Sequence, residues 1–252
     1  MNLEKLKETW RYEERYSFKG WDFSHINNRM EEETLPWDYK KLVKSYISEE
    51  KILLDMGTGG GEFLLSLNPT EGKTYATESY LPNIELCKSV LTSYGIDVRP
   101  VSDDSNLPFD DRYFDIIINR HESFCVTEIN RILKPGGIFI TQQVGGMNNR
   151  EISKFLLGEY PNITDIDLNL DKILLEAKAI GMRIIDTGEC FPKTYFYDIG
   201  AFVFYAKIIE WEFPGFSVER CFNKLVELQA KLEKQGYIET LEHRYFLIAE
   251  KQ

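Results

Sequence analysis

The distribution of apolar residues along the middle of the chain predicts a mostly parallel β-sheet with helices between its strands. Short apolar runs alternate with stretches of helical periodicity from about residue 51 to residue 142. This is the pattern of repeated β-α-β units. The first run, Ile52 to Leu54, contains no polar residue, as expected for a strand that is buried on both faces. The pattern therefore predicts an α/β fold.

Strands and helices can be placed from the same pattern. Strands are predicted where a short apolar run is bounded by turn residues, at 51–55, 73–77, 97–101, 114–118, 138–142, about 182–187 and 245–249. Helices are predicted where apolar residues recur every three or four positions, at 62–67, 83–94, 126–133, 170–180 and about 218–235. An apolar and aromatic stretch, residues 197–216, separates the last two strands.

The composition fits one α/β core with attachments. The chain has 252 residues, of which 43% are hydrophobic and 28% charged, and this is enough to bury a sizeable core. Aromatic residues crowd residues 10–37 and 195–216, outside the predicted sheet. We therefore predict that residues 1–45 form an N-terminal helical cap segment. Residues 46–252 are predicted to form one domain with a cap insertion at about 195–236.

Charge and cysteine content narrow the possible partners. The formal net charge is −11, so the average surface field repels phosphate and nucleic acid is not an expected partner. The sequence shows neither a secretion signal nor a run of about 20 apolar residues, which predicts a cytoplasmic protein without a membrane partner. The cysteines form no CxxC pair, so no metal is expected.

A glycine-rich segment follows the first predicted strand. Asp55 ends the strand, and Gly57, Thr58 and three further glycines come after it. Glycine lacks a Cβ, so such a turn can adopt unusual backbone angles and a ligand can lie against its backbone. The N–H groups and the following helix favour an anionic group. A tight turn without any ligand would show the same pattern, so the loop alone is a weak signal.

Carboxylates follow the next two strands. Glu78 comes at roughly the 20-residue offset expected for a carboxylate that binds ribose hydroxyls. Asp103 and Asp104 stand before a Leu-Pro-Phe turn at residues 107–109, where a carboxylate can accept the amine of an adenine. The three signals together predict a site for a nucleoside cofactor.

These segments, with Phe114-Asp115 and the Leu-Lys-Pro-Gly-Gly turn at residues 133–137, resemble class I S-adenosylmethionine-dependent methyltransferases of the type 11 group. The likeness covers about residues 51–143. It implies a Rossmann-like sheet of seven strands, mostly parallel with an antiparallel final strand, and helices on both faces. It also implies S-adenosyl-L-methionine as the cofactor and S-adenosyl-L-homocysteine as the product.

The resemblance implies a role for each cofactor residue. The methionine moiety would lie on the loop 57–61, Glu78 would hold the ribose hydroxyls, and Asp103 would bind the adenine amine, a role that Asp104 can share. The full set assigned to the cofactor is Asp55, Gly57, Thr58, Gly59, Glu78, Ser79, Tyr80, Asp103, Asp104 and Asn119. The sequence departs from the family at Glu78, where Asp is more common, and in the polar run 119–123, where relatives are more apolar.

Two residues of that polar run are candidate bases. Methyl transfer from a sulfonium mainly requires an aligned nucleophile and the exclusion of water. A base helps when the acceptor is a hydroxyl or a protonated amine, and His121 is the first candidate because its ordinary pKa of about 6.5 is close to working pH. Glu122 is the second candidate. A histidine that is only satisfied by hydrogen bonds at a strand end is an equally good interpretation of His121.

The aromatic segments supply the candidates for binding the acceptor. Trp37, Tyr195, Asp198 and Trp211 are possible pocket residues, because segments added to a shared core often decide the substrate. The alternative interpretation is that these rings only form the core between cap and body.

The function predicted is methyl transfer to a small molecule by a monomer or homodimer. Two alternatives remain, an RNA methyltransferase and a catalytically inactive regulatory protein that binds S-adenosylmethionine. A nicotinamide dehydrogenase would share the glycine loop and the strand-end carboxylate. Its fingerprint fails here, because Glu62 occupies the position of the third glycine.

Overall fold

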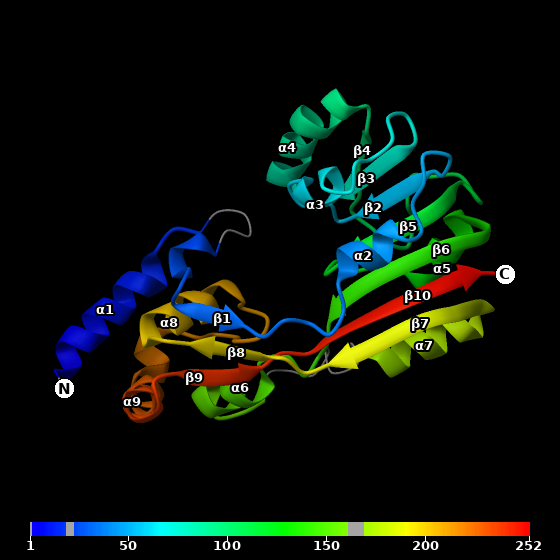
Figure 1. Ribbon diagram of the computed structural model, residues 1–252. Coiled ribbons are helices and arrows are strands. Elements are labelled where there is room, and N and C mark those ends of the chain that lie inside the picture. The colour runs from blue at the N-terminus through cyan, green and yellow to red at the C-terminus, as the bar shows by residue number, and fades with distance from the viewer. Residues whose placement is uncertain (1, 19–22, 161–168) are drawn as a thin grey trace. The chain divides into compact units, whose positions relative to one another are not determined.

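The computed structural model describes residues 2–18, 23–160 and 169–252 (Figure 1). The chain divides into two compact units. Unit 1 comprises residues 1–35, 145–167 and 190–243, and unit 2 comprises residues 36–144, 168–189 and 244–252. The predicted cap segments, 1–45 and about 195–236, therefore lie mostly in unit 1, which also takes in residues 145–167.

Unit 2 is built on a mixed β-sheet, whose strands are labelled in Figure 1. In the described residues its seven strands have the order β4-β3-β2-β5-β6-β10-β7. The first five are parallel, and β10 pairs antiparallel with β6. The strands are β2 (Leu53–Met56), β3 (Thr74–Glu78), β4 (Asp97–Pro100), β5 (Phe114–Arg120), β6 (Leu133–Val144), β7 (Met182–Cys190) and β10 (Arg244–Lys251). The predicted fold class is confirmed.

Both faces of this sheet are buried. Neighbouring residues of β5 alternate between two apolar clusters, with Ile117 in one and Ile116 and Ile118 in the other. This alternation is the period-two geometry of a strand, and it explains why the apolar runs contain no polar positions. The helices of unit 2 are α2 (Tyr39–Lys44), α3 (Glu62–Leu65), α4 (Leu81–Leu91), α5 (Val126–Ile132) and α7 (Leu170–Ala179), with a 3₁₀ turn η2 (Thr92–Tyr94).

The strand order reverses between β2 and β5. From β2 the chain builds β3 and β4 on one side of the sheet, and then returns to build β5 and β6 on the other. Met56 at the end of β2 therefore pairs with Asn119 near the end of β5. In open α/β sheets, ligands bind at the carboxyl ends of the strands beside such a reversal. The loops that follow β2 and β5 are consequently where a site is expected.

Unit 1 contains a second sheet that the sequence pattern does not reveal. Its strands β1 (Met30–Glu32), β8 (Lys193–Phe196) and β9 (Ile238–Leu241) are short and pair antiparallel. The partners are far apart in the sequence, so no hairpin signal marks them. The other elements of unit 1 are α1 (Leu3–Arg15), η1 (Ser24–Ile26), α6 (Arg150–Leu157), α8 (Ile199–Ile208) and α9 (Val218–Gln235).

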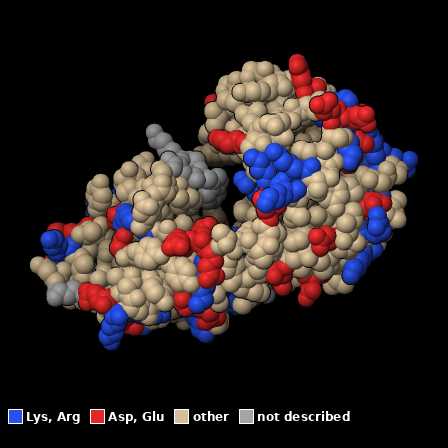
Figure 2. Space-filling model, in the orientation of Figure 1, with Lys and Arg blue, Asp and Glu red and all other residues tan. Residues whose placement is uncertain are grey.

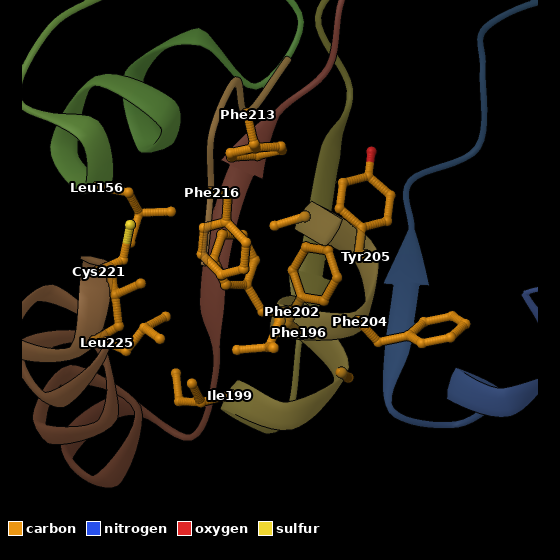
Figure 3. Close-up of a cluster of buried hydrophobic side chains, with 14 of the residues drawn as sticks. Leu156, Phe196, Ile199, Phe202, Phe204, Tyr205, Phe213, Phe216, Cys221 and Leu225 are labelled. Carbon is orange, nitrogen blue, oxygen red and sulfur yellow. The ribbon is translucent and has the colours of Figure 1, made fainter. Parts of the chain in front are cut away.

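Aromatic rings form the core of unit 1 (Figure 3). Phe196, Phe202 and Phe213 are fully buried. They meet edge to face, with the ring centroids of Phe196 and Phe202 5.3 Å apart, a geometry that aromatic pairs favour. The stretch that the sequence shows as apolar and aromatic is thus, in large part, the packed interior of this unit.

An ion-pair network centred on Arg29 joins three segments of unit 1. The Arg29 guanidinium donates to Asp198, which caps the N-terminus of α8, at 2.7 and 2.8 Å. It also donates to Glu13 of α1 at 2.8 Å, and His25 lies 2.7 Å from the other oxygen of Glu13. A Cβ at Gly200 would lie 2.9 Å from the guanidinium, so the absence of a side chain there makes room for the network.

We expect Arg29→Met to destabilise unit 1. The substitution leaves the Glu13 side chain, which is 10% exposed, without its arginine, and this costs roughly 1–3 kcal/mol, less than in a fully buried pair because solvent screens Arg29. Thermal denaturation followed by circular dichroism measures the effect. Arg11→Met is the control, because Arg11 pairs with the exposed Glu219. Equal shifts in melting temperature for both variants would contradict the role given to Arg29.

Candidate functional site

The loop after β2 needs glycine for two physical reasons. Gly57, Gly59 and Gly61 have φ values of +65°, +62° and +88°, a region that residues with a Cβ rarely adopt. A Cβ at Gly57 would also lie 2.3 Å from Cγ of Glu122, in the loop after β5. The two loops beside the strand reversal are therefore in direct contact, and only glycine permits that approach.

The loop has already used most of its own hydrogen-bond donors. The N–H groups of Thr58 and Gly61 donate to the carbonyls of Thr77 and Thr58, and the N–H of Gly59 donates to Glu78. On the other side, the Cys87 thiol donates to the Gly59 carbonyl at 2.8 Å. Few N–H groups remain for a phosphate, unlike in loops that cradle one.

Asp55 is a buried carboxyl group under this loop. Its side chain is 4% exposed and accepts a hydrogen bond of 2.7 Å from the Thr58 hydroxyl. Burial raises the pKa of Asp55 to about 7, against the influence of Thr58 and of the positive charge of Arg120, while the charge of Glu78 raises it further. Asp55 therefore changes its charge near neutral pH.

Glu78 is held by three backbone N–H groups at the end of β3. Its Oε1 accepts from Ser79 and Tyr80 at 2.9 Å, and its Oε2 accepts from Gly59 at 2.8 Å. A carboxylate offers about four acceptor positions, so Oε2 can accept one further donor while these bonds persist. If two ligand hydroxyls were to donate to Oε2, the Gly59 N–H would have to move away from it.

Asp103 and Asp104 lie after β4 and face different partners. Oδ1 of Asp103 accepts the hydroxyl and N–H of Ser105, which lowers the pKa of Asp103; within the described residues Oδ2 accepts no hydrogen bond. Asp104 instead accepts the Ser123 hydroxyl at 2.5 Å and is thereby tied to the loop after β5. Oδ1 of Asp104 likewise accepts no hydrogen bond from the described residues, but the Asp103 side chain is the more exposed of the two.

Tyr80 and Leu81 follow Glu78 at the start of α4. Their side chains are 61% and 66% exposed. These two side chains lie next in sequence to Glu78, whose carboxylate can accept a hydroxyl. Together they offer an apolar surface that a flat ring could cover.

Asn119 lies beneath the loop after β5 and is fully buried. Its Oδ1 accepts from Gln143 at 2.5 Å and from Thr141 at 3.3 Å, and its Nδ2 donates to the Ser123 carbonyl at 3.4 Å. The same Gln143 amide donates to the Glu122 carbonyl at 3.1 Å. Asn119 and Gln143 thus hold this loop from below.

Glu122 completes a group of acidic side chains around the glycine loop. Burial, and then the charges of Glu78 and Asp104, raise the pKa of Glu122. Glu122 lies against Gly57, Asp55 accepts from Thr58 and Glu78 accepts from Gly59, so three carboxyl groups contact neighbouring residues of one loop. We call Asp55, Glu78, Asp104 and Glu122 the carboxylate cluster. Such a cluster repels a phosphate and attracts a cation.

His121 has a left-handed backbone with φ of +62°. Its N–H donates to the Gln142 carbonyl at 2.9 Å, and its Nε2 lies 3.0 Å from Nε2 of Gln142. The His121 side chain is exposed. The protein atoms around the ring, and then the positive charges of Arg244 and Arg120, lower the pKa of His121 and so favour the neutral imidazole.

The residues predicted to bind the acceptor are divided between the two units. Trp37 lies in unit 2, where its Nε1 donates to Oε1 of Gln142 at 2.8 Å. The other three lie in unit 1: Tyr195 donates to Glu33, Asp198 caps α8, and Trp211 is 56% exposed. Their role in acceptor binding stays a prediction.

Residues that sequence reasoning missed are Gln142, Gln143 and Cys87. The two glutamines could have been found from the sequence, because they are adjacent polar residues at the end of an apolar strand, at the same end of the sheet as the predicted site. Nothing in the pattern marks Cys87 as a partner of Gly59.

Two hollows lie elsewhere on the protein, and both are too small to be alternative candidates for the functional site. One, of about 170 Å³, lies in unit 1 against Met147, Arg150 and Phe191. The other, of about 160 Å³, lies in unit 2 against Ile47, Leu67 and Thr70. Both are smaller than the roughly 300–1,000 Å³ of most small-molecule sites.

The surface carries charges of both signs. On the face in Figure 2, acidic and basic side chains are interspersed, and a basic group lies over α2, which contains Lys40, Lys41 and Lys44. None of the helices that the structure describes has the length and apolar character needed to cross a bilayer. The described residues also contain no group of three or more His, Cys, Asp or Glu side chains arranged to hold a metal ion.

Known sequences match the central part of the chain. Residues 54–141 match the family model of a methyltransferase domain of type 11. Among curated proteins, the phthiotriol/phenolphthiotriol dimycocerosates methyltransferase of Mycobacterium tuberculosis is 35% identical over 91 residues, which are 33% of this chain and 33% of that protein. The match thus spans about one third of the length of this relative.

Solved structures match a larger part of the fold. A proposed methyltransferase from Bacillus halodurans C-125 has a TM-score of 0.60 and 16% identity, covering 85% of this chain and 98% of its own. The [4+2]-cyclase SpnF has a TM-score of 0.51 and 19% identity, covering 84% of this chain and 80% of its own. Likeness at this identity establishes the fold alone. Residues 54–141 therefore resemble a type 11 methyltransferase domain, and the fold around them is one that this chain shares with the solved structures.

Proposed function

We propose that the protein transfers a methyl group from S-adenosylmethionine to a small-molecule acceptor. The observation that carries this proposal is the carboxylate cluster around the glycine loop, within the segment that matches the methyltransferase domain. The fold alone would not be sufficient, because a cyclase shares it.

The charge of the cofactor fits the charge of the site. S-adenosylmethionine carries a positive sulfonium and a positive ammonium group, which carboxylates attract. A nicotinamide dinucleotide carries a pyrophosphate, which the same carboxylates repel, and the loop has few N–H groups left to bind it. The cluster therefore favours the sulfonium cofactor over the dinucleotide.

The remaining contacts suit an adenosine. We propose that Oε2 of Glu78 accepts a ribose hydroxyl and that Oδ2 of Asp103 accepts the adenine amine, as the hydrogen bonds left open on these oxygens allow. Tyr80 and Leu81 would then be covered by the adenine ring. When bound, the cofactor supplies an electrophilic methyl group. The residues of the chain bind it, orient it and exclude water.

Charge also supports a small-molecule acceptor. The net charge of −11 disfavours RNA, and the basic group over α2 contains only a few lysines. The curated relatives are named for phthiotriol and phenolphthiotriol dimycocerosates, so methylation of a non-nucleic-acid acceptor occurs among related domains. A cytoplasmic location and a monomeric or homodimeric state belong to the same proposal.

A transfer assay with methyl-labelled S-adenosylmethionine tests this function. The purified protein is incubated with separate pools of small metabolites, lipids and RNA, and the label in each pool is counted. The proposal predicts label in a small-molecule or lipid pool. Label in RNA alone would support the RNA methyltransferase, and tight cofactor binding without transfer to any pool would support the regulatory protein.

Glu78→Gln should weaken cofactor binding about 10- to 100-fold, the equivalent of the 1.5–3 kcal/mol typical of a hydrogen bond to a charged group. The glutamine oxygen can still accept from Ser79 and Tyr80. Its amide nitrogen replaces Oε2 and cannot accept either the ribose hydroxyl or the Gly59 N–H. Calorimetry with S-adenosylhomocysteine measures the loss. Glu85→Gln on the exposed side of α4 makes the same charge change and should bind normally. A Glu78→Gln affinity within twofold of the original would refute the ribose contact.

Rising pH should favour S-adenosylmethionine over S-adenosylhomocysteine. The Asp55 carboxyl group is neutral below its pKa of about 7 and ionised above it, and only S-adenosylmethionine carries the sulfonium charge. Between pH 6 and pH 7.5 we expect the ratio of the two affinities to rise about 3- to 10-fold. Asp55→Asn, which keeps the acceptor for Thr58, should make the ratio nearly constant. A ratio that falls with pH in the unmodified protein would contradict the electrostatic account.

A further inference from the structure

Three side chains at the end of β5 and β6 form a hydrogen-bonded chain within unit 2. Trp37, which precedes α2, donates from Nε1 to Oε1 of Gln142 at 2.8 Å. Nε2 of Gln142 lies 3.0 Å from Nε2 of His121. The chain therefore runs from Trp37 through Gln142 to His121, the first candidate base.

The indole N–H of Trp37 determines which atom donates in each hydrogen bond of this chain. An indole N–H can only donate, so the oxygen of the Gln142 amide must face Trp37. The amide nitrogen, which is a donor, must then face His121. Nε2 of His121 consequently has to accept, and in a neutral imidazole the proton is then on Nδ1. The orientation of the amide follows from its indole partner, so it does not depend on telling nitrogen from oxygen.

The backbone of His121 gives a second, independent observation. A left-handed φ of +62° costs about 1 kcal/mol or more in a residue with a Cβ. It is maintained by the bond from the His121 N–H to the Gln142 carbonyl and by the bond from Gln143 to the Glu122 carbonyl. Strained conformations that the surroundings enforce are concentrated at functional sites.

Protonation of His121 would oppose this arrangement. A second ring N–H at Nε2 would point at the Gln142 amino group, donor against donor. The nearby charges of Arg120 and Arg244 would repel the imidazolium. Nδ1 of the neutral ring makes no hydrogen bond to any residue that the structure describes, and it is thus available to a ligand.

We propose that Trp37 and Gln142 are positioning residues that hold His121 as a neutral imidazole protonated at Nδ1, a hydrogen-bond donor to the methyl acceptor and not a general base. The tautomer stands on the contacts alone, whereas the role toward the acceptor rests on the proposed function. The acceptor molecule would present an oxygen or nitrogen lone pair to Nδ1–H. As the bond from sulfur to the methyl carbon breaks and the acceptor–methyl bond forms, any proton lost by the acceptor passes to water.

Nitrogen NMR on the complete ¹⁵N-labelled protein tests the tautomer without cofactor or acceptor. The chain has only three histidines, and His121→Ala identifies the signals of this ring. We expect long-range ¹H–¹⁵N correlations of an Nδ1–H tautomer, with no protonation between pH 5.5 and pH 8. An Nε2–H tautomer, or protonation near the ordinary histidine pKa, would overturn the proposal.

Two substitutions test the positioning residues. Trp37→Phe removes the indole donor and keeps a ring against Phe246, so His121 should become a mixture of tautomers. Gln142→Glu supplies an acceptor to both neighbours and should move the proton of His121 to Nε2. An unchanged His121 spectrum in both variants would overturn the role of Trp37 and Gln142.

The transfer assay separates a donor from a base. His121→Asn keeps an N–H donor near the position of Nδ1, and asparagine tolerates a left-handed backbone, but an amide cannot take up a proton. We expect His121→Asn to retain at least about one third of the transfer rate and His121→Ala to lose about 10-fold or more. Equal losses in both variants would overturn the donor role. No transfer by the unmodified protein would count against the proposed function, and the NMR result would still decide the tautomer.

Discussion

The site depends on the contact between two loops where the strand order of the sheet reverses. The Glu122 side chain occupies the space that a Cβ of Gly57 would fill, so the loop after β5 closes directly on the loop after β2. Any larger residue at position 57 would separate the loops or distort a backbone that is already left-handed. The Ser123 hydroxyl also ties the loop after β5 to Asp104, which follows β4, and Asn119 holds the same loop through the Ser123 carbonyl.

Bringing several carboxylates together is unfavourable unless something offsets their repulsion. Three backbone N–H groups stabilise Glu78 and a hydroxyl stabilises Asp55. The remaining repulsion and burial are visible in the raised pKa values of Asp55 and Glu122. A cationic ligand would relieve that repulsion, and this is an electrostatic reason for the sulfonium cofactor that we propose. The same reasoning disfavours a dinucleotide.

The sequence predicts the sheet of unit 2 well, and the reason is that its signals are local. Strands buried on both faces have uninterrupted apolar runs, and the glycine loop and Glu78 are marked by short motifs. The sheet of unit 1 has no such signal, because β1 pairs with β8, more than 160 residues away in sequence, between Met30 and Phe196. The contact of Trp37 with Gln142 is 105 residues apart, so the hydrogen-bond environment of His121 could not be predicted either.

The most direct test of the central claim is a crystal structure of the protein grown with S-adenosylhomocysteine. The account predicts a ribose hydroxyl on Oε2 of Glu78, the adenine amine on Oδ2 of Asp103 and the ring over Tyr80. S-adenosylhomocysteine bound away from the loop 57–61, with Glu78 contacting only its backbone partners, would contradict the account.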